Sequence, residues 1–73
     1  MKVQFEYVDF DGAVKSSEAD VFEEGEWFWA VNLDQFGHGK RVSSVLAWHP
    51  VKAALGLLVG GRAIKSWKQG DQA

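Results

Sequence analysis

The chain has 73 residues, no cysteine, four Trp, five Phe, one Tyr and a formal net charge of −2. A chain of this length predicts a single domain, residues 1–73, and such a domain buries only about 60% of the surface that its unfolded form exposes, so its core needs large side chains. The lack of cysteine excludes a disulfide framework, a thiolate metal site and a cysteine nucleophile.

The first predicted element is a strand over residues 2–10, where apolar and polar side chains alternate. The Asp11-Gly12 pair that follows is typical of a hairpin with a type I′ turn, in which both central residues have positive φ. Residues 13–22 then form the returning strand. A short helix beginning near Ser17 is the alternative, but the strand needs fewer assumptions.

A third strand is predicted over residues 26–33, the central strand of the sheet. Its alternation puts Trp27 and Trp29 on one face and Phe28 on the other. We expect the two tryptophans to hold the sheet to a helix and Phe28 to be the side chain whose exposure matters for binding. A tight turn at Gly25 introduces this strand and carries three carboxylates, Glu23, Glu24 and Glu26.

After a loop over residues 34–39, alternation resumes over residues 40–50, with Val42, Leu46 and Trp48 on one face. Pro50 suits the first position of a helix. Residues 51–59 would then place an apolar arc of roughly 200° on that helix.

Glycine should end the helix at Gly60-Gly61, because a longer helix would turn basic side chains into its apolar arc. Residues 62–68 fit either a short edge strand or a final helical turn. Residues 69–73 are predicted to be a frayed tail.

Together these elements predict an α+β fold: a small antiparallel meander of three to five strands with one helix, about residues 50–60, packed on one face. A small SH3-like β-barrel is the alternative, suggested by the succession of short strands with paired aromatics. The helical segment argues against the barrel.

A membrane location is not expected. The longest apolar segment, residues 51–59, is far shorter than the roughly 20 residues that span a bilayer, and residues 1–10 do not resemble a signal peptide. We therefore expect a soluble, cytoplasmic protein.

Catalytic and metal-binding patterns are weak, so we expect no enzyme, no metal and no cofactor. Neither His38 nor His49 has a recognisable catalytic partner. Residues 9–12 share two acidic positions with a calcium loop but lack its later oxygen ligands. Residues 37–40 and 60–62 place glycine beside a base, as phosphate loops do, but neither precedes a predicted helix start.

Charge is distributed unevenly along the chain. Residues 1–34 hold nine acids against Lys2 and Lys15, a charge of −7, whereas residues 35–73 hold six bases against Asp71, a charge of +5. Two oppositely charged faces would follow from this order, and so would internal pairing of the two halves.

The leading functional hypothesis is a non-catalytic domain that binds a protein partner with a basic surface. An acidic surface would steer association with such a partner, and an exposed aromatic would anchor the contact. The candidate residues of this acidic face are Asp9, Asp11, Glu18, Asp20, Glu23, Glu24, Glu26 and Phe28. Solvated hairpin charges that merely prevent aggregation are the structural alternative.

Two other hypotheses stay open. A nucleic-acid-binding module would use the basic half, namely Lys40, Arg41, Arg62, Lys65, Trp67 and Lys68, although the acidic pI near 5.5 argues against it. A homodimer or larger homo-oligomer would associate through the apolar helix at Leu55, Leu57 and Leu58.

In its small size, lack of cysteine and acidic half, the chain resembles the small phage-encoded inhibitors of host defence, such as anti-CRISPR and anti-restriction proteins. This resemblance is one of type and carries over no residue. It implies a protein that acts by occupying a surface on a nucleic-acid-handling complex.

Overall fold

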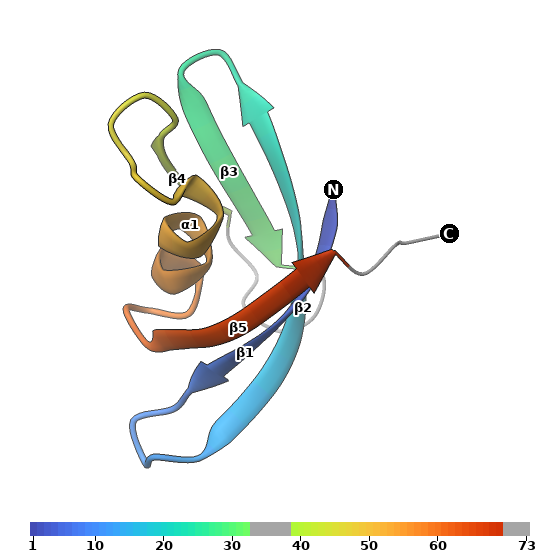
Figure 1. Cartoon of the computed structure of the whole chain (residues 1–73), viewed down its shortest axis with the longest axis vertical. Coiled ribbons are helices and arrows are strands. Elements are labelled where there is room, and N and C mark those ends of the chain that lie inside the picture. Colours follow the sequence, from blue (N-terminus) through green and yellow to red (C-terminus); the bar gives the residue numbers. More distant parts are fainter. Residues whose placement is uncertain (33–38, 70–73) are drawn as a thin grey trace.

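The computed structural model describes residues 1–32 and 39–69. Its elements in chain order are β1 (Lys2–Val8), β2 (Val14–Glu24), β3 (Trp27–Asn32), β4 (Lys40–Ser43), α1 (Pro50–Leu58) and β5 (Ala63–Gln69). The strands form one antiparallel sheet in the order β4-β3-β2-β1-β5, and α1 lies against one side of it (Figure 1). The predicted α+β fold with one helix is confirmed, and the sheet does not close into the alternative barrel.

The topology is a meander over the first four strands, after which the chain crosses through α1 and returns beside β1. The segment over residues 62–68 is therefore an edge strand, β5, and not a helical turn. The returning segment after the first turn is also a strand, as expected. The prediction that residues 26–33 form the central strand is wrong, because β2 occupies that position.

The Asp11-Gly12 pair lies in the turn of the β1–β2 hairpin, as predicted, but this turn is not of type I′. Among the described residues only glycines have positive φ, so Gly12 (φ 86°) takes that conformation and Asp11 does not. The N–H of Gly12 donates to the Asp9 carbonyl at 2.9 Å, and the Asp11 carboxylate accepts from the Ala13 N–H at 2.9 Å. This is a type I turn followed by a glycine bulge.

The second turn, between β2 and β3, has two residues, Gly25 and Glu26. Gly25 has φ 61° and Glu26 does not have positive φ. Glycine at the first central position is typical of a type II′ turn, whose twist matches that of the flanking strands. The tight turn at Gly25 is thus confirmed.

The helix begins and ends where the sequence predicts. Pro50 is at its start, and the side chain of His49 makes no capping hydrogen bond. At the other end Gly60 N–H donates to Leu57 O at 3.0 Å and Gly61 N–H to Gly56 O at 2.8 Å. These two bonds form a Schellman motif, which requires the left-handed conformation that glycine adopts freely at φ 68° and 87°.

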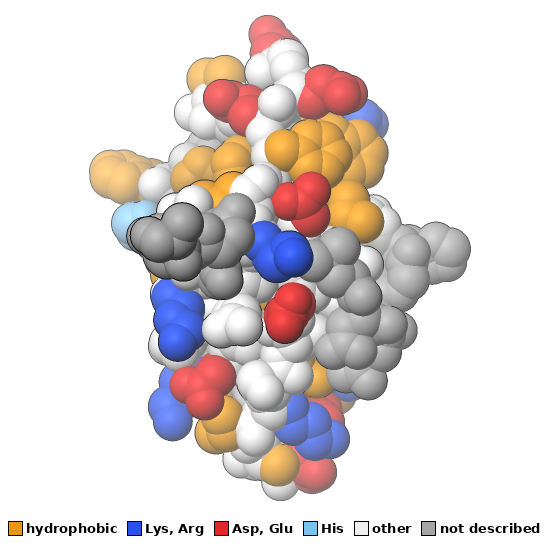
Figure 2. Space-filling view, turned by 90° about the vertical axis from the view of Figure 1, so that its right-hand side faces the viewer, with side chains coloured by type: hydrophobic (Ala, Val, Ile, Leu, Met, Phe, Trp, Pro, Cys, Tyr) orange, Lys and Arg blue, Asp and Glu red, His pale blue; other side chains and the backbone are white. Residues whose placement is uncertain are grey.

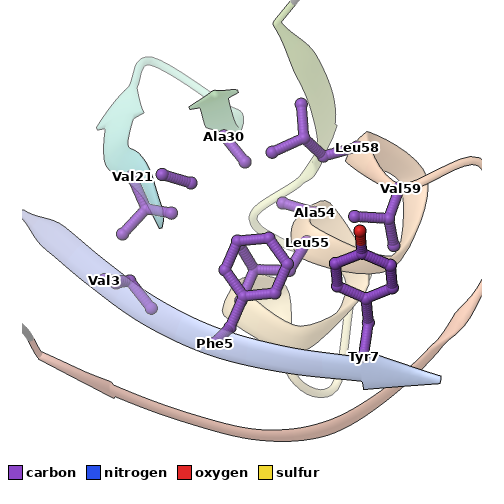
Figure 3. Close-up of a cluster of buried hydrophobic side chains, with 10 residues drawn as sticks. Val3, Phe5, Tyr7, Val21, Ala30, Ala54, Leu55, Leu58 and Val59 are labelled. Atoms are coloured by element: carbon purple, nitrogen blue, oxygen red, sulfur yellow. The ribbon is translucent and has the colours of Figure 1, made fainter. Parts of the chain in front are cut away.

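The core lies between the sheet and α1. Phe5 and Tyr7 rise from β1 toward the helix, where Leu55 and Val59 meet them (Figure 3). The other buried apolar side chains are Val3, Ala19, Val21, Ala30, Ala54 and Leu58. Burial of this set removes apolar surface from water and is the main stabilising contribution to the fold.

The predicted face assignment of β3 is inverted. Val21 pairs with Ala30 and Glu23 with Phe28, so Ala30 and Phe28 lie on the face that α1 covers, and Phe28 packs half-buried against the core. Trp27 and Trp29 therefore lie on the helix-free face. Since the side-chain period of a strand is two residues, one wrong assignment moves every side chain to the other face.

The alternating pattern after residue 40 is also only partly a strand. β4 ends at Ser43, and residues 44–49 form a connection to α1 in which Leu46 and Trp48 are exposed. The predicted loop over residues 34–39 lies almost wholly outside the described residues, as does His38. Of the predicted tail, Gln69 ends β5 and residues 70–73 lie outside the described ranges.

An ionic clasp joins the first turn to the start of β5. The carboxylate of Asp9 accepts hydrogen bonds from Lys15 Nζ at 2.5 Å and from Arg62 Nε at 2.7 Å. Arg62 also donates to the carbonyl of Val59 at 2.6 Å, and its guanidinium lies 4.3 Å from the ring centre of Phe10. One arginine thus ties the end of α1 to the β1–β2 hairpin.

Replacing Asp9 with asparagine should lower the free energy of unfolding at neutral pH. The hydrogen bonds from Lys15 and Arg62 hold the pKa of the Asp9 carboxyl well below its ordinary value of 3.8. A depressed pKa stabilises the fold above that value, and the contribution is lost as the pH falls below it. Urea denaturation of both proteins should show a difference at pH 7 that shrinks in acid, and a difference that stays constant with pH would contradict this reading.

Candidate protein-binding surface

The helix-free face of the sheet carries a cluster of aromatic side chains. Phe22 on β2 pairs with Trp29 on β3, and their rings are stacked with centres 6.4 Å apart and planes at 12°. Trp27 lies on the same face, two residues earlier in β3. We name Phe22, Trp27, Trp29 and Arg41 together the aromatic cluster.

Arg41 on β4 completes the cluster. Its guanidinium lies 4.1 Å from the ring centre of Trp27 and 5.5 Å from that of Trp29. A guanidinium over the face of an indole is attracted by the ring quadrupole, and it is more weakly hydrated than an ammonium. Arg41 makes no ion pair within residues 1–32 and 39–69, so its hydrogen-bond donors are not taken up by a carboxylate there.

The cluster is accessible. Phe22 is 38% and Trp27 40% exposed, and Trp29 is half-buried. Figure 2 looks onto this face and shows hydrophobic side chains gathered in its upper part, with acidic side chains beside them. A contiguous exposed patch of large apolar side chains is typical of an interaction site.

Two glutamates border the cluster. Glu24 pairs with Trp27, so its side chain lies on the helix-free face beside the indole, and Glu26 lies in the turn that leads into β3. Glu23 pairs with Phe28 and therefore belongs to the opposite face. Neither Glu24 nor Glu26 forms an ion pair in the part of the chain that the structure describes.

The remaining members of the predicted acidic face lie elsewhere. Asp9 and Asp11 are in the β1–β2 turn, at the far end of β2, whose 11 residues span on the order of 35 Å. Asp9 is held in the clasp and Asp11 in its turn, while Asp20 binds the N-terminal ammonium at 3.0 Å. The structure thus divides the acidic set between the two ends of the sheet, with Glu18 and Asp20 between them on β2.

Below the aromatic cluster the same face is polar. An open hollow of about 670 Å³ lies over β5, β1 and β2, and its lining includes Glu6, Glu18 and Lys68. Ser66 donates to the Glu6 carboxylate at 3.0 Å within this hollow. The helix-free face therefore has an aromatic half and a polar half of mixed charge.

The predicted basic set is also divided. Lys40 and Arg41 are on β4, whereas Lys65, Trp67 and Lys68 are on β5, at the opposite edge of the sheet. Lys40 pairs with Ala30 and so points to the other face from its neighbour Arg41. The sixth member, Arg62, is engaged in the clasp. No single surface gathers these bases.

The helix presents little surface for association. Leu55 and Leu58 are buried in the core, and of the three predicted interface leucines only Leu57 is exposed. An interface that uses all three leucines would require the core to unfold locally. Association through this helical face stays a prediction, and of the three leucines Leu57 alone is accessible for it.

A second exposed apolar segment, not predicted from the sequence, follows β4. Val45, Leu46 and Trp48 in the connection after β4 are strongly exposed, and Trp48 is 95% exposed. The N–H of Ser44 donates to the Glu26 carbonyl at 2.9 Å, which fixes the start of this connection beside the β2–β3 turn. The signal was present in the sequence as an apolar run directly before Pro50 that belongs to no helix.

Within residues 1–32 and 39–69, no group of His, Asp and Glu side chains is arranged to hold a metal ion, and no helix is long and apolar enough to cross a bilayer. Comparison with known proteins adds no relative to this description. No family model, no curated protein and no solved structure matches the chain.

Proposed function

We propose that this chain is a non-catalytic protein-binding domain whose working surface is the aromatic cluster with Glu24 and Glu26 at its border. The observation that carries the proposal is the exposure of Trp27 and Phe22 on the sheet face opposite α1. A face of this kind retains a large apolar area in water, and a partner that covers it gains the corresponding hydrophobic free energy.

The composition of the cluster supports a protein as the partner. Aromatic residues and arginine are enriched at the centre of protein interfaces, where a few of them contribute most of the binding free energy. Charged side chains at the border contribute specificity and association rate. Glu24 and Glu26 occupy that border and are free of ion pairs among the described residues, so the complementary partner surface is basic.

Nucleic-acid-binding sites of proteins offer such a basic surface with room for aromatic rings. They combine lysine and arginine side chains that bind phosphate with aromatic side chains on which nucleobases stack. Carboxylates beside flat indole rings match both features. In this proposal the chain occupies a nucleic-acid-handling surface on a larger protein and blocks it, as the inhibitors that it resembles in type do.

Direct binding of nucleic acid is less well supported. Glu24 lies beside Trp27, so a phosphate near the aromatic cluster would meet a carboxylate as well as Arg41. The lysines of β5 are at the other edge of the sheet. A continuous basic path along the nucleic-acid backbone, which such binding requires, is not formed by the described residues.

The experiment is affinity capture with the purified chain as bait, followed by binding measurements on the captured protein. Glu24→Lys should weaken binding about tenfold, mostly through a slower association rate and a changed salt dependence. Glu23→Lys is the matched control: it makes the same charge change one residue away on the opposite face, and should alter affinity far less. Equal effects of the two substitutions would count against this surface.

A further inference from the structure

We propose that, when no other partner is bound, a second copy of this chain covers the aromatic cluster in a two-fold symmetric dimer. The proposal shares its surface with the proposed function and adds a regulation to it, since one face cannot hold both occupants. The dimer itself needs no partner protein and can be measured with the chain alone.

The architecture leaves the sheet face opposite α1 open to solvent. α1 contacts β3, β4 and β5 from one side, and on the other side Phe22 and Trp27 remain exposed. The second face of an antiparallel sheet is commonly polar and solvated, whereas this one carries large apolar side chains. A second sheet can supply that layer by face-to-face packing, as in a β-sandwich.

Charge is arranged on this face in an order that a second copy can match. Going across the strands, Glu24 lies on β2, Trp27 on β3 and Arg41 on β4. The guanidinium of Arg41 lies closer to the ring of Trp27 than to that of Trp29, 4.1 Å against 5.5 Å. Arg41 is paired with Trp29 in the sheet, but its guanidinium reaches over the ring of Trp27, whose partner on β2 is Glu24. The face thus has a negative side, an aromatic centre and a positive side.

A two-fold axis that runs along β3 in the plane of the interface exchanges these two sides. Arg41 of one copy then faces Glu24 of the second copy, and the reverse contact forms at the same time, as in every isologous interface. Within one chain neither group has an ion pair among the described residues. The two contacts between copies would supply the missing partner of each.

The helix and the edge of β5 fit a second copy less well. Leu55 and Leu58 on the helix are buried in the core. The free edge of β5 carries Lys65 and Lys68, and a β-bulge interrupts its pairing with β1. Lysines and bulges on an edge strand oppose edge-to-edge pairing of two copies.

The consequence is competition. A dimer that buries the aromatic cluster lowers the concentration of chains able to bind a partner, and a partner that binds the monomer dissociates the dimer by mass action. The second copy would cover the aromatic cluster until a partner protein binds the monomer and replaces it.

Sedimentation velocity of the purified chain over micromolar to millimolar concentration tests the dimer. The wild type should shift reversibly toward twice the 8.1 kDa of one chain. Arg41→Glu and Glu24→Arg should each weaken the dimer by on the order of 10- to 100-fold, because each places like charges opposite one another. Glu23→Arg, on the opposite face, is the control and should leave the dimer unchanged.

Mixing the two single variants is the decisive step. A heterodimer of Arg41→Glu with Glu24→Arg regains both opposite-charge contacts, so the mixture should associate more strongly than either variant alone, which also shows that both are folded. A wild type that stays monomeric throughout, a dimer that Glu23→Arg weakens equally, or a mixture without rescue would overturn the proposal. None of these results tests the binding of another protein, which the capture experiment measures separately.

Discussion

Replacing Leu55 with alanine should lower the free energy of unfolding by about 2–5 kcal/mol, the range for truncating a fully buried leucine. Leu55 has no exposed surface and lies between the helix and Phe5 of β1 (Figure 3). The substitution removes apolar contacts and leaves a cavity that a helix of nine residues, held at one end by the Schellman turn, cannot easily close. Since small domains have little stability to spare, such a loss approaches the total for many of them.

Leu57→Ala is the matched control on the same helix. Its side chain is 47% exposed, so the same chemical change should alter the free energy of unfolding by no more than about 0.5 kcal/mol. Urea denaturation of both variants gives the comparison. Similar losses at the two positions would mean that α1 is rotated relative to the sheet.

Replacing Trp27 with alanine should weaken binding of a partner protein by about 30-fold or more, corresponding to about 2 kcal/mol, the level that marks an energetically dominant interface residue. The indole lies at the centre of the proposed surface, between Glu24 and the guanidinium of Arg41. Its removal also takes away the ring that positions Arg41. The helix-covered core should stay intact, because Trp27 is on the opposite face.

Trp67→Ala provides an unusually close comparison. Trp67 is 42% exposed and Trp27 is 40% exposed, so the two substitutions remove the same kind of side chain at nearly the same solvent exposure. Trp67 is on the edge strand β5 and pairs with Phe5, away from the aromatic cluster. Its replacement should change partner affinity by less than about threefold, because residues outside the few that dominate an interface have small effects when truncated.

The elements that could be predicted from sequence are those fixed by local chemistry. Pro50 begins α1 and the Gly60-Gly61 pair ends it, because one residue lacks an N–H and the other two adopt positive φ without strain. Gly12 and Gly25 mark the β1–β2 and β2–β3 turns for the same reason. Only the type of the first turn differed, since Asp11 keeps a negative φ.

The faces of β3 could not be read from its own residues. Both faces of this strand are apolar, so alternation alone does not say which one a helix will cover. The small side chain of Ala30 leaves room for α1 and is buried beneath it, whereas the large rings of Trp27 and Trp29 find space on the open face and stack with Phe22 and Arg41. The choice follows from tertiary packing and not from strand periodicity.

The grouping of residues in the candidate surface could not be predicted from the sequence for a related reason. Charges that are close in sequence, such as Glu23 and Glu24, lie on opposite faces of a strand, and charges of one half of the chain are spread along a long strand. The pairing of β5 with β1 joins residues about 60 positions apart, as in the contact of Ser66 with Glu6. Such long-range pairing leaves no pattern in either segment alone, so the division of the basic set between two edges could not be foreseen.

The sheet face opposite α1 is the proposed contact surface, and one capture experiment tests this most directly. Wild-type chain, Trp27→Ala and Trp67→Ala are immobilised side by side, exposed to lysate of the cells in which the chain acts, treated with nuclease, and read by mass spectrometry. We expect one protein that resists nuclease on wild type and Trp67→Ala and is lost from Trp27→Ala. Retention of that protein by Trp27→Ala with its loss from Trp67→Ala would contradict this and point to β5, and so would a wild type that keeps no protein after nuclease treatment.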